Sequence, residues 1–120
     1  MKKIEINLKQ PHFFGSWNLE NNNLCDEIIK FFDENRNLQK QGVSGAGKNI
    51  KIKKTTDISI SPDDLKIKKY KILNAYINEL HACFLDYQNQ WPFLKSMLKS
   101  VDIGSFNIQK YSQGDHFAAI

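Results

Sequence analysis

The sequence contains no apolar run that approaches the roughly 20 residues a helix needs to cross a bilayer. Its first residues, Met1-Lys2-Lys3, lead into alternating apolar and polar positions and not into the apolar core of a signal peptide. We therefore expect a cytoplasmic protein with no membrane partner.

Cysteine is also scarce, since the chain has only Cys25 and Cys83. Both lie in segments with helical periodicity and apolar neighbours. That setting predicts two buried thiols and disfavours a disulfide or a cysteine metal pair.

Arginine is nearly absent: Arg36 is the only one, and the net charge of +4 comes from lysine. The lysines gather in residues 48–54 and 66–71, where a phosphate-tracking surface could form. No arginine cluster and no interleaved aromatic residues accompany them. A solvated lysine-rich face is the simpler interpretation, so nucleic acid is not expected as a partner. A small basic nucleic-acid-binding protein stays open as an alternative.

What is present is an ordinary globular composition, with 120 residues, 41% hydrophobic and 25% charged. We expect a single domain over residues 1–120. Alternation from Ile4 to Leu8 predicts a half-buried strand that ends at Pro11. Asn21 to Asn23 offer caps for an amphipathic helix that runs to about Asn35.

The middle of the chain predicts one more strand and two more helices. Residues 54–60 are β-branched and alternating, as in a strand. Ser61 to Asp64 has the hydroxyl, proline and acidic residues of a helix start, and an apolar stripe then continues to about Gln90. Pro92 ends that helix, and residues 93–98 allow a short amphipathic helix.

The only glycine-rich segment, Gly42 to Lys48, fits the first seven positions of a phosphate-binding P-loop. The eighth position should be Ser or Thr and is Asn49. A P-loop also needs a buried strand before it and a helix after it, so that backbone N–H groups converge on the phosphates. Here a polar helical segment precedes the loop and an alternating one follows. A flexible surface loop is favoured, and a P-loop-like nucleotide-binding protein remains an alternative.

The chain is organised around its last stretch, from Phe106 to Phe117. Phe106 and Ile108 alternate with Asn107, Gln109 and Tyr111, which predicts a strand with one apolar and one polar face. Residues 112–115 read as a turn, and residues 117–120 resume an apolar extended run.

An apolar-alternating strand followed by Tyr111-x-x-Gly114 and then Phe117 resembles the active-site entry of 2-oxoglutarate and Fe(II)-dependent dioxygenases of the prolyl-4-hydroxylase-like superfamily. Residues 54–60, Lys-Thr-Thr-Asp-Ile-Ser-Ile, are similar to a segment upstream of the core in that family. There the motif continues into His-x-Asp or His-x-Glu, the first two iron ligands. This sequence stops at Ile120, so we expect the N-terminal part of such an enzyme, cut before its metal site.

The resemblance implies an α+β fold, with helices packed on the first strands of a double-stranded β-helix, the jelly-roll or cupin-like barrel. The helical support would span about 1–104, and the first core strand and turn about 105–120. The implied parent enzyme is a hydroxylase whose cofactors are Fe(II) and the co-substrate 2-oxoglutarate, with an unknown primary substrate. The fragment alone should be inactive.

The resemblance also implies which residues of this chain would line the pocket. Tyr111, Gln109 and Asn107 would bind the co-substrate or water if their shared face lines the cavity. Phe106 and Ile108 would then pack against the long helix. No catalytic residue is expected in this chain, and no metal ligand either, because the ligands should follow Ile120.

The three histidines are not expected to bind iron. His12 and His81 are isolated. His116 follows Asp115 in the reverse of the family order.

Overall fold

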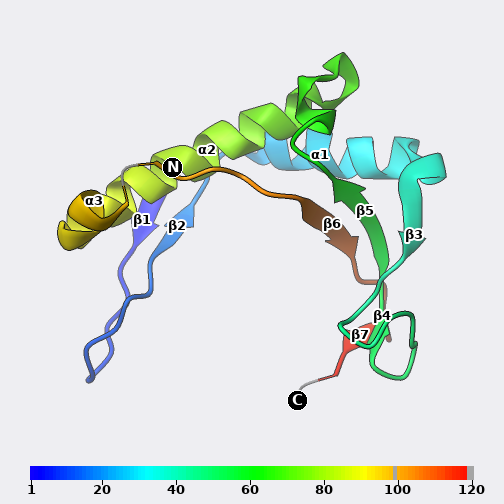
Figure 1. Cartoon of the computed structure of the whole chain (residues 1–120), viewed down its shortest axis with the longest axis horizontal. Coiled ribbons are helices and arrows are strands. Elements are labelled where there is room, and N and C mark those ends of the chain that lie inside the picture. The colour runs from blue at the N-terminus through cyan, green and yellow to red at the C-terminus, as the bar shows by residue number, and fades with distance from the viewer. Residues whose placement is uncertain (99, 119–120) are drawn as a thin grey trace.

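The computed structural model describes residues 1–98 and 100–118. Helices α1 (Asn22–Glu34) and α2 (Lys71–Gln90) form one layer, and strands descend from both ends of it (Figure 1). The short helical elements are η1 (Arg36–Leu38), η2 (Asp64–Lys66), η3 (Lys68–Tyr70) and α3 (Phe93–Met97). The mixed α+β class expected from the sequence is confirmed.

The main sheet is antiparallel, with the order β3 (Gln39–Gln41), β5 (Thr56–Ile60) and β6 (Phe106–Lys110). Asp57 pairs with Gln109, and Ile58 pairs with Ile108. Successive side chains of a strand point to opposite faces, so this register gives the sheet one apolar and one polar face.

The apolar face of the sheet builds the core together with the helices. Ile58 and Ile60 of β5 are almost fully buried. Phe106 and Ile108 pack against the same cluster, as expected from the alternation in β6. The buried members of the cluster are Phe31, Phe32, Ile58, Ile60, Tyr70 and Leu73.

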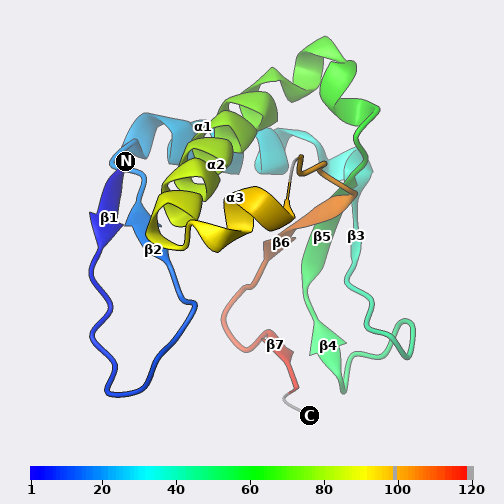
Figure 2. The same cartoon turned by 60° about the vertical axis from the view of Figure 1, so that its left-hand side comes forward.

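Two further strand pairs complete the described chain. β4 (Lys53–Lys54) pairs with β7 (His116–Phe117) below the main sheet (Figure 2). β1 (Lys2–Ile4) pairs with β2 (Ser16–Asn18) at the opposite end of the helix layer. All three sheets are small and antiparallel. The apolar run expected at 117–120 is described only to Ala118, so Ala119 and Ile120 lie outside the described residues.

The structure agrees with the sequence-based prediction at three helix boundaries: the start of α1, the end of α2 and the start of α3. The Asn21 side chain caps α1 by accepting a hydrogen bond from Leu24 N at 3.0 Å. α2 ends at Gln90, before Pro92, and α3 follows it. The predicted helix start at Ser61 is wrong for α2, because η2 and η3 occupy residues 64–66 and 68–70 and the helix begins at Lys71.

Two other expectations near the surface are wrong. The predicted strand from Ile4 to Leu8 ends at Ile4, and both of these side chains are exposed. Cys25 is exposed, whereas Cys83 is buried as expected, and both thiols are free. Burial raises the pKa of the Cys83 thiol, and the neighbouring Glu79 carboxylate raises it further.

Within the described residues, none of the helices combines the length and the apolar character needed to cross a bilayer.

Candidate functional site: the polar face of the sheet

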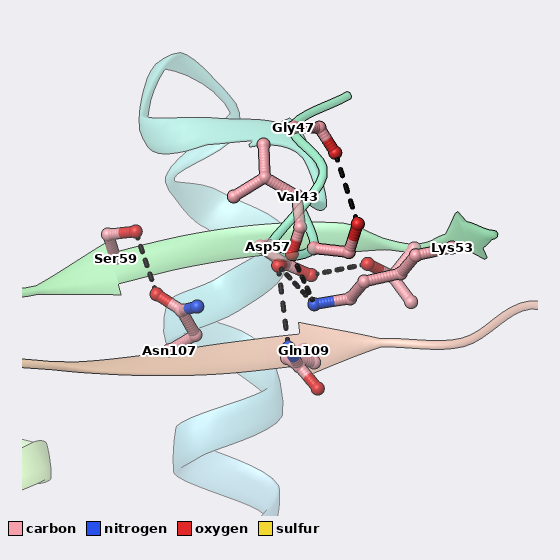
Figure 3. Close-up of polar contacts among 9 residues, drawn as sticks. Val43, Gly47, Lys53, Asp57, Ser59, Asn107 and Gln109 are labelled. Carbon is pink, nitrogen blue, oxygen red and sulfur yellow. Dashed lines mark hydrogen bonds and ion pairs between the residues drawn. The ribbon is translucent and has the colours of Figure 1, made fainter. Parts of the chain in front are cut away.

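The polar face of β5 and β6 brings together residues that lie about 50 positions apart in the sequence. Asp57 and Ser59 of β5 stand beside Gln109 and Asn107 of β6 (Figure 3). Ser59 Oγ donates to Asn107 Oδ1 at 2.7 Å. Two of the three predicted pocket residues, Asn107 and Gln109, therefore share this face.

Asp57 is the centre of the site, and its side chain is about 1% exposed. Thr55 Oγ1 donates to Asp57 Oδ1 at 2.7 Å. Lys53 Nζ lies 3.3 Å from Asp57 Oδ2, as a buried ion pair within one chain segment. Gln109 Nε2 donates to the same oxygen at 3.5 Å. Paired and hydrogen-bonded in this way, a carboxylate can stay charged inside a protein.

Lys53 is enclosed from the other side. Its Nζ donates to Val43 O at 3.4 Å and lies 5.2 Å from the centre of the Phe117 ring. The β4–β7 pairing sets Lys53 opposite Phe117. Among the described residues that are not exposed, every buried side-chain nitrogen and oxygen atom has a hydrogen-bond partner. The expectation of a solvated lysine face is therefore wrong at Lys53.

Gly42 lets the chain pass directly over this network. A Cβ atom at Gly42 would lie 1.9 Å from Thr55 Oγ1 and 3.1 Å from Asp57 Oδ2. The Gly42 N–H donates to Thr55 O at 3.0 Å, which holds the close approach. Only a residue without a side chain fits here.

The hydrogen bonds orient the two amides. Because an ionised carboxylate only accepts hydrogen bonds, Gln109 turns its NH₂ group to Asp57 and its carbonyl oxygen away from it (Figure 3). Asn107 uses its carbonyl oxygen for Ser59, so its NH₂ group is left for other partners. Both side chains are exposed. The open face thus presents one donor and one acceptor, two residues apart on β6.

Tyr111 lies just beyond the end of β6 and is 47% exposed. It helps to line a groove of about 370 Å³ beside α1, together with Ile29 and Phe32. Among the described residues, its hydroxyl has no hydrogen-bond partner, and the structure does not join it to the Asp57 network.

The glycine-rich loop makes its own tight turn. Ser44 and Gly47 exchange backbone hydrogen bonds of 3.1 and 2.9 Å. A turn at residues 50–52 and then β4 follow the loop, where a P-loop is followed by a helix.

The described residues do not fit a resident iron ion. Residues 1–98 and 100–118 contain no group of three or more His, Cys, Asp or Glu side chains that could hold a metal. His12 Nε2 lies 3.3 Å from Ile6 O, and His116 Nε2 lies 3.2 Å from Lys51 O, each close to a backbone oxygen. Neutral Asn and Gln amides are also unlike the two-histidine, one-carboxylate set of non-haem iron enzymes.

Sequence reasoning missed Lys53, Thr55, Asp57 and Gly42. Spacing carried a usable signal, because Lys53, Thr55 and Asp57 are two residues apart and fall on one face of an extended chain.

Comparison of this chain with models of known protein families, with curated proteins and with solved structures finds no match.

Proposed function

We propose that this chain is the N-terminal part of a cytoplasmic 2-oxoglutarate and Fe(II)-dependent dioxygenase of the prolyl-4-hydroxylase-like superfamily. The parent enzyme would couple oxidative decarboxylation of 2-oxoglutarate to hydroxylation of a primary substrate. In this proposal residues 1–120 supply the helical support and the first strands of a double-stranded β-helix. The iron ligands belong to residues that would follow Ile120.

One observation carries the proposal. The two segments that resemble the family, residues 54–60 and 106–117, contain neighbouring antiparallel strands of one sheet. Their apolar side chains pack under the helices, and their polar side chains gather on the opposite face. This is the division expected of a barrel wall that has helices outside and a polar cavity inside.

The edge of the sheet also agrees with this proposal. β6 is the last strand in the order β3–β5–β6, so its outer edge has no partner strand among the described residues. Unpaired strand edges are normally protected in natural proteins. Further barrel strands would pair there.

The amide orientations assign different tasks to the two pocket residues. The carboxylates and keto group of 2-oxoglutarate accept hydrogen bonds, so the free NH₂ group of Asn107 suits the co-substrate. The carbonyl oxygen of Gln109 suits a water molecule or a donor group of the primary substrate. The Tyr111 hydroxyl would reach the co-substrate only after its side chain moves away from α1. Fe(II), held by residues outside this chain, would supply the oxidation chemistry.

The first test is the coding sequence downstream of Ile120. We expect His-x-Asp or His-x-Glu within a few residues, and a later histidine followed by a basic residue. A gene that ends at Ile120, or that continues without a histidine and carboxylate pair, would overturn the proposal.

The second test uses the chain extended by that downstream sequence. Succinate formation should depend on Fe(II) and 2-oxoglutarate, and Asn107→Ala should raise the KM for 2-oxoglutarate about tenfold, the value of one lost hydrogen bond of about 1.4 kcal/mol. Asn78→Ala, which changes an exposed asparagine of α2, is the matched control and should leave KM unchanged. In contrast, residues 1–120 alone should show no tight stoichiometric Fe(II) binding by calorimetry.

A further inference from the structure

A hollow of about 660 Å³ lies where η1, β3 and β4 meet the turn at residues 112–115. Three cationic side chains from three segments line it: Arg36 of η1, Lys40 of β3 and Lys54 of β4. Among the described residues that line it, Asp115 is the only acidic one. We call this site the basic hollow. Its other lining residues are Gln39, Gln41, Ile50, Thr55, Thr56 and Ser112.

The positive charge of the basic hollow is only partly neutralised. Lys54 Nζ lies 3.8 Å from Asp115 Oδ1, so this pair offsets one cation. Within the described part of the chain, neither Arg36 nor Lys40 forms an ion pair. Glu34, two residues before Arg36, lines a separate hollow with lysines of α1 and η3. Three positive charges against one negative charge give the lining a net charge of +2.

The other carboxylates near the basic hollow are already bound by lysines. Asp33 Oδ1 lies 3.4 Å from Lys110 Nζ. Asp57 stands opposite Lys40 in the β3–β5 register, but its carboxylate is buried against Lys53 at 3.3 Å. Arg36 and Lys40 are therefore left to bind an anion from outside the chain.

Neutral hydrogen-bond donors accompany the cations. Thr56, Ser112 and Gln41 line the hollow, and their side chains carry hydroxyl or amide donors. Ile50, which is 59% exposed, adds one apolar side chain to the lining. An anion with several oxygen atoms can accept hydrogen bonds from these groups and from the cations together.

We propose that the basic hollow binds the phosphate groups of a phosphorylated ligand. The planar guanidinium of Arg36 matches two phosphate oxygens at once, and Lys40 and Lys54 act as point charges around them. Phosphate is favoured over carboxylate because it offers three acceptor oxygens to a site whose donors come from several segments. The phosphate belongs either to a free nucleotide or to a single strand of nucleic acid.

The glycine-rich segment from Gly42 to Lys48 borders the basic hollow, because Gln41 and Ile50 on its two sides line it. β3 leads from the end of α1 to this segment, which is followed by β4 (Figure 2). Lys48, the lysine of the P-loop pattern, does not line the hollow. The site therefore differs from a P-loop, which binds phosphate through that lysine and backbone N–H groups.

The proposal goes beyond the dioxygenase proposal and does not depend on it. Neither Asn107 nor Gln109 lines the basic hollow. The experiments below use neither Fe(II) nor 2-oxoglutarate, and they need no sequence downstream of Ile120. Either proposal can therefore fail without the other.

Nuclear magnetic resonance of the purified chain tests the proposal at Arg36. Because Arg36 is the only arginine, its Nε–Hε group gives a single, directly assignable side-chain signal. We expect pyrophosphate to shift this signal in a saturable way, with a Kd below about 1 mM at about 0.15 M salt. Citrate, which carries a similar negative charge on carboxylates, should shift it far less. An unmoved signal, or equal shifts with both anions, would overturn the proposal.

Variants measured by calorimetry give the second arm. Arg36→Ala and Lys40→Ala should each weaken pyrophosphate binding about tenfold, because each removes a charged donor from the hollow. Lys48→Ala removes one exposed cation outside the hollow and is the charge-matched control, with an expected change below about twofold. A loss in Lys48→Ala as large as in Arg36→Ala would overturn the proposal, since binding would then follow net charge alone.

Asp115→Asn is a variant that a damaged fold cannot imitate. It removes the one negative charge of the lining and releases Lys54, so pyrophosphate should bind about threefold tighter or more. Asparagine keeps a side-chain oxygen that can accept the hydrogen bond from Ser112 N. Unchanged or weaker binding in this variant would contradict the proposal, and circular dichroism checks that all variants are folded.

The nucleotide ATP and a single-stranded oligonucleotide distinguish the two sources of phosphate. A free nucleotide fits within the hollow, so its affinity should be insensitive to Lys48→Ala. A strand extends beyond the hollow and would contact Lys48 and Lys51 as well, so its affinity should fall in that variant. Binding of either ligand with a shift of the Arg36 signal supports the proposal, and failure of both to shift it would overturn it.

Discussion

At the scale of single residues, two Lys–Asp ion pairs have nearly equal N–O distances but differ in burial. Lys53 and Asp57 are 3.3 Å apart with side chains 4% and 1% exposed. Lys66 and Asp63 are 3.1 Å apart with side chains 79% and 89% exposed. Breaking a buried pair leaves a charge without water or partner, whereas an exposed pair is screened.

We therefore expect Asp57→Asn to lower the free energy of unfolding by about 3 kcal/mol or more. Asp63→Asn, the matched control, should change it by less than about 1 kcal/mol. Urea denaturation measures both values. Similar small losses in the two variants would show that Lys53 reaches water when its partner is removed.

The residues of this network were only partly predictable. Asn107 and Gln109 could be found because alternation in one strand fixes which side chains share a face. Alternation also places Lys53 and Asp57 on one face, but it does not report that they are buried, because their burial depends on β6, β7 and the Gly42 segment, which are distant in the sequence. Tyr111 lies one residue past the end of β6, where alternation no longer decides its direction.

At the scale of elements, local signals set most boundaries correctly, and the misses have tertiary causes. Ser61 and Asp64 do form a reciprocal cap, with hydrogen bonds of 3.2 and 2.8 Å. That turn ends at Ile67, which is extended, and Asn74 of α2 donates to Leu65 O and fixes the turn against the helix. The strand predicted to reach Leu8 fails because pairing with β2 stops at Ile4.

The cap of α1 is the element whose contribution is easiest to isolate. Asn21→Ala removes the acceptor for Leu24 N and should lower the free energy of unfolding by about 1 kcal/mol. Asn23→Ala changes an exposed asparagine in the first turn and should be neutral or slightly stabilising, since alanine favours helix. Thermal melts followed at 222 nm would compare them. Equal changes in the two variants would show that the Asn21 cap adds nothing to the free energy of unfolding.

At the scale of the whole molecule, the chain is wider than its length suggests. The radius of gyration over Cα atoms is 16.8 Å, whereas a compact domain of this length has about 14 Å. The strand groups at the two ends of the helix layer account for the difference (Figure 1). No periodicity in the sequence reports such a shape, because it depends on how far elements stand apart.

Small-angle X-ray scattering of the monomeric chain should therefore give a radius of gyration near 17 Å or slightly larger, since hydration adds to the Cα value. A control domain of similar length and ordinary compactness should give about 14 Å. A value near 14 Å for this chain would mean that the hairpin and the sheet close on each other in solution.

The close passage of Gly42 over Thr55 links two positions that are 13 residues apart. A relative with alanine at position 42 would need a residue without a γ atom, alanine or glycine, at position 55, and a relative that keeps threonine at 55 must keep glycine at 42. We therefore expect the residues at positions 42 and 55 to covary among relatives of this chain. Aligned sequences of relatives would display that coupling before any of their structures were determined.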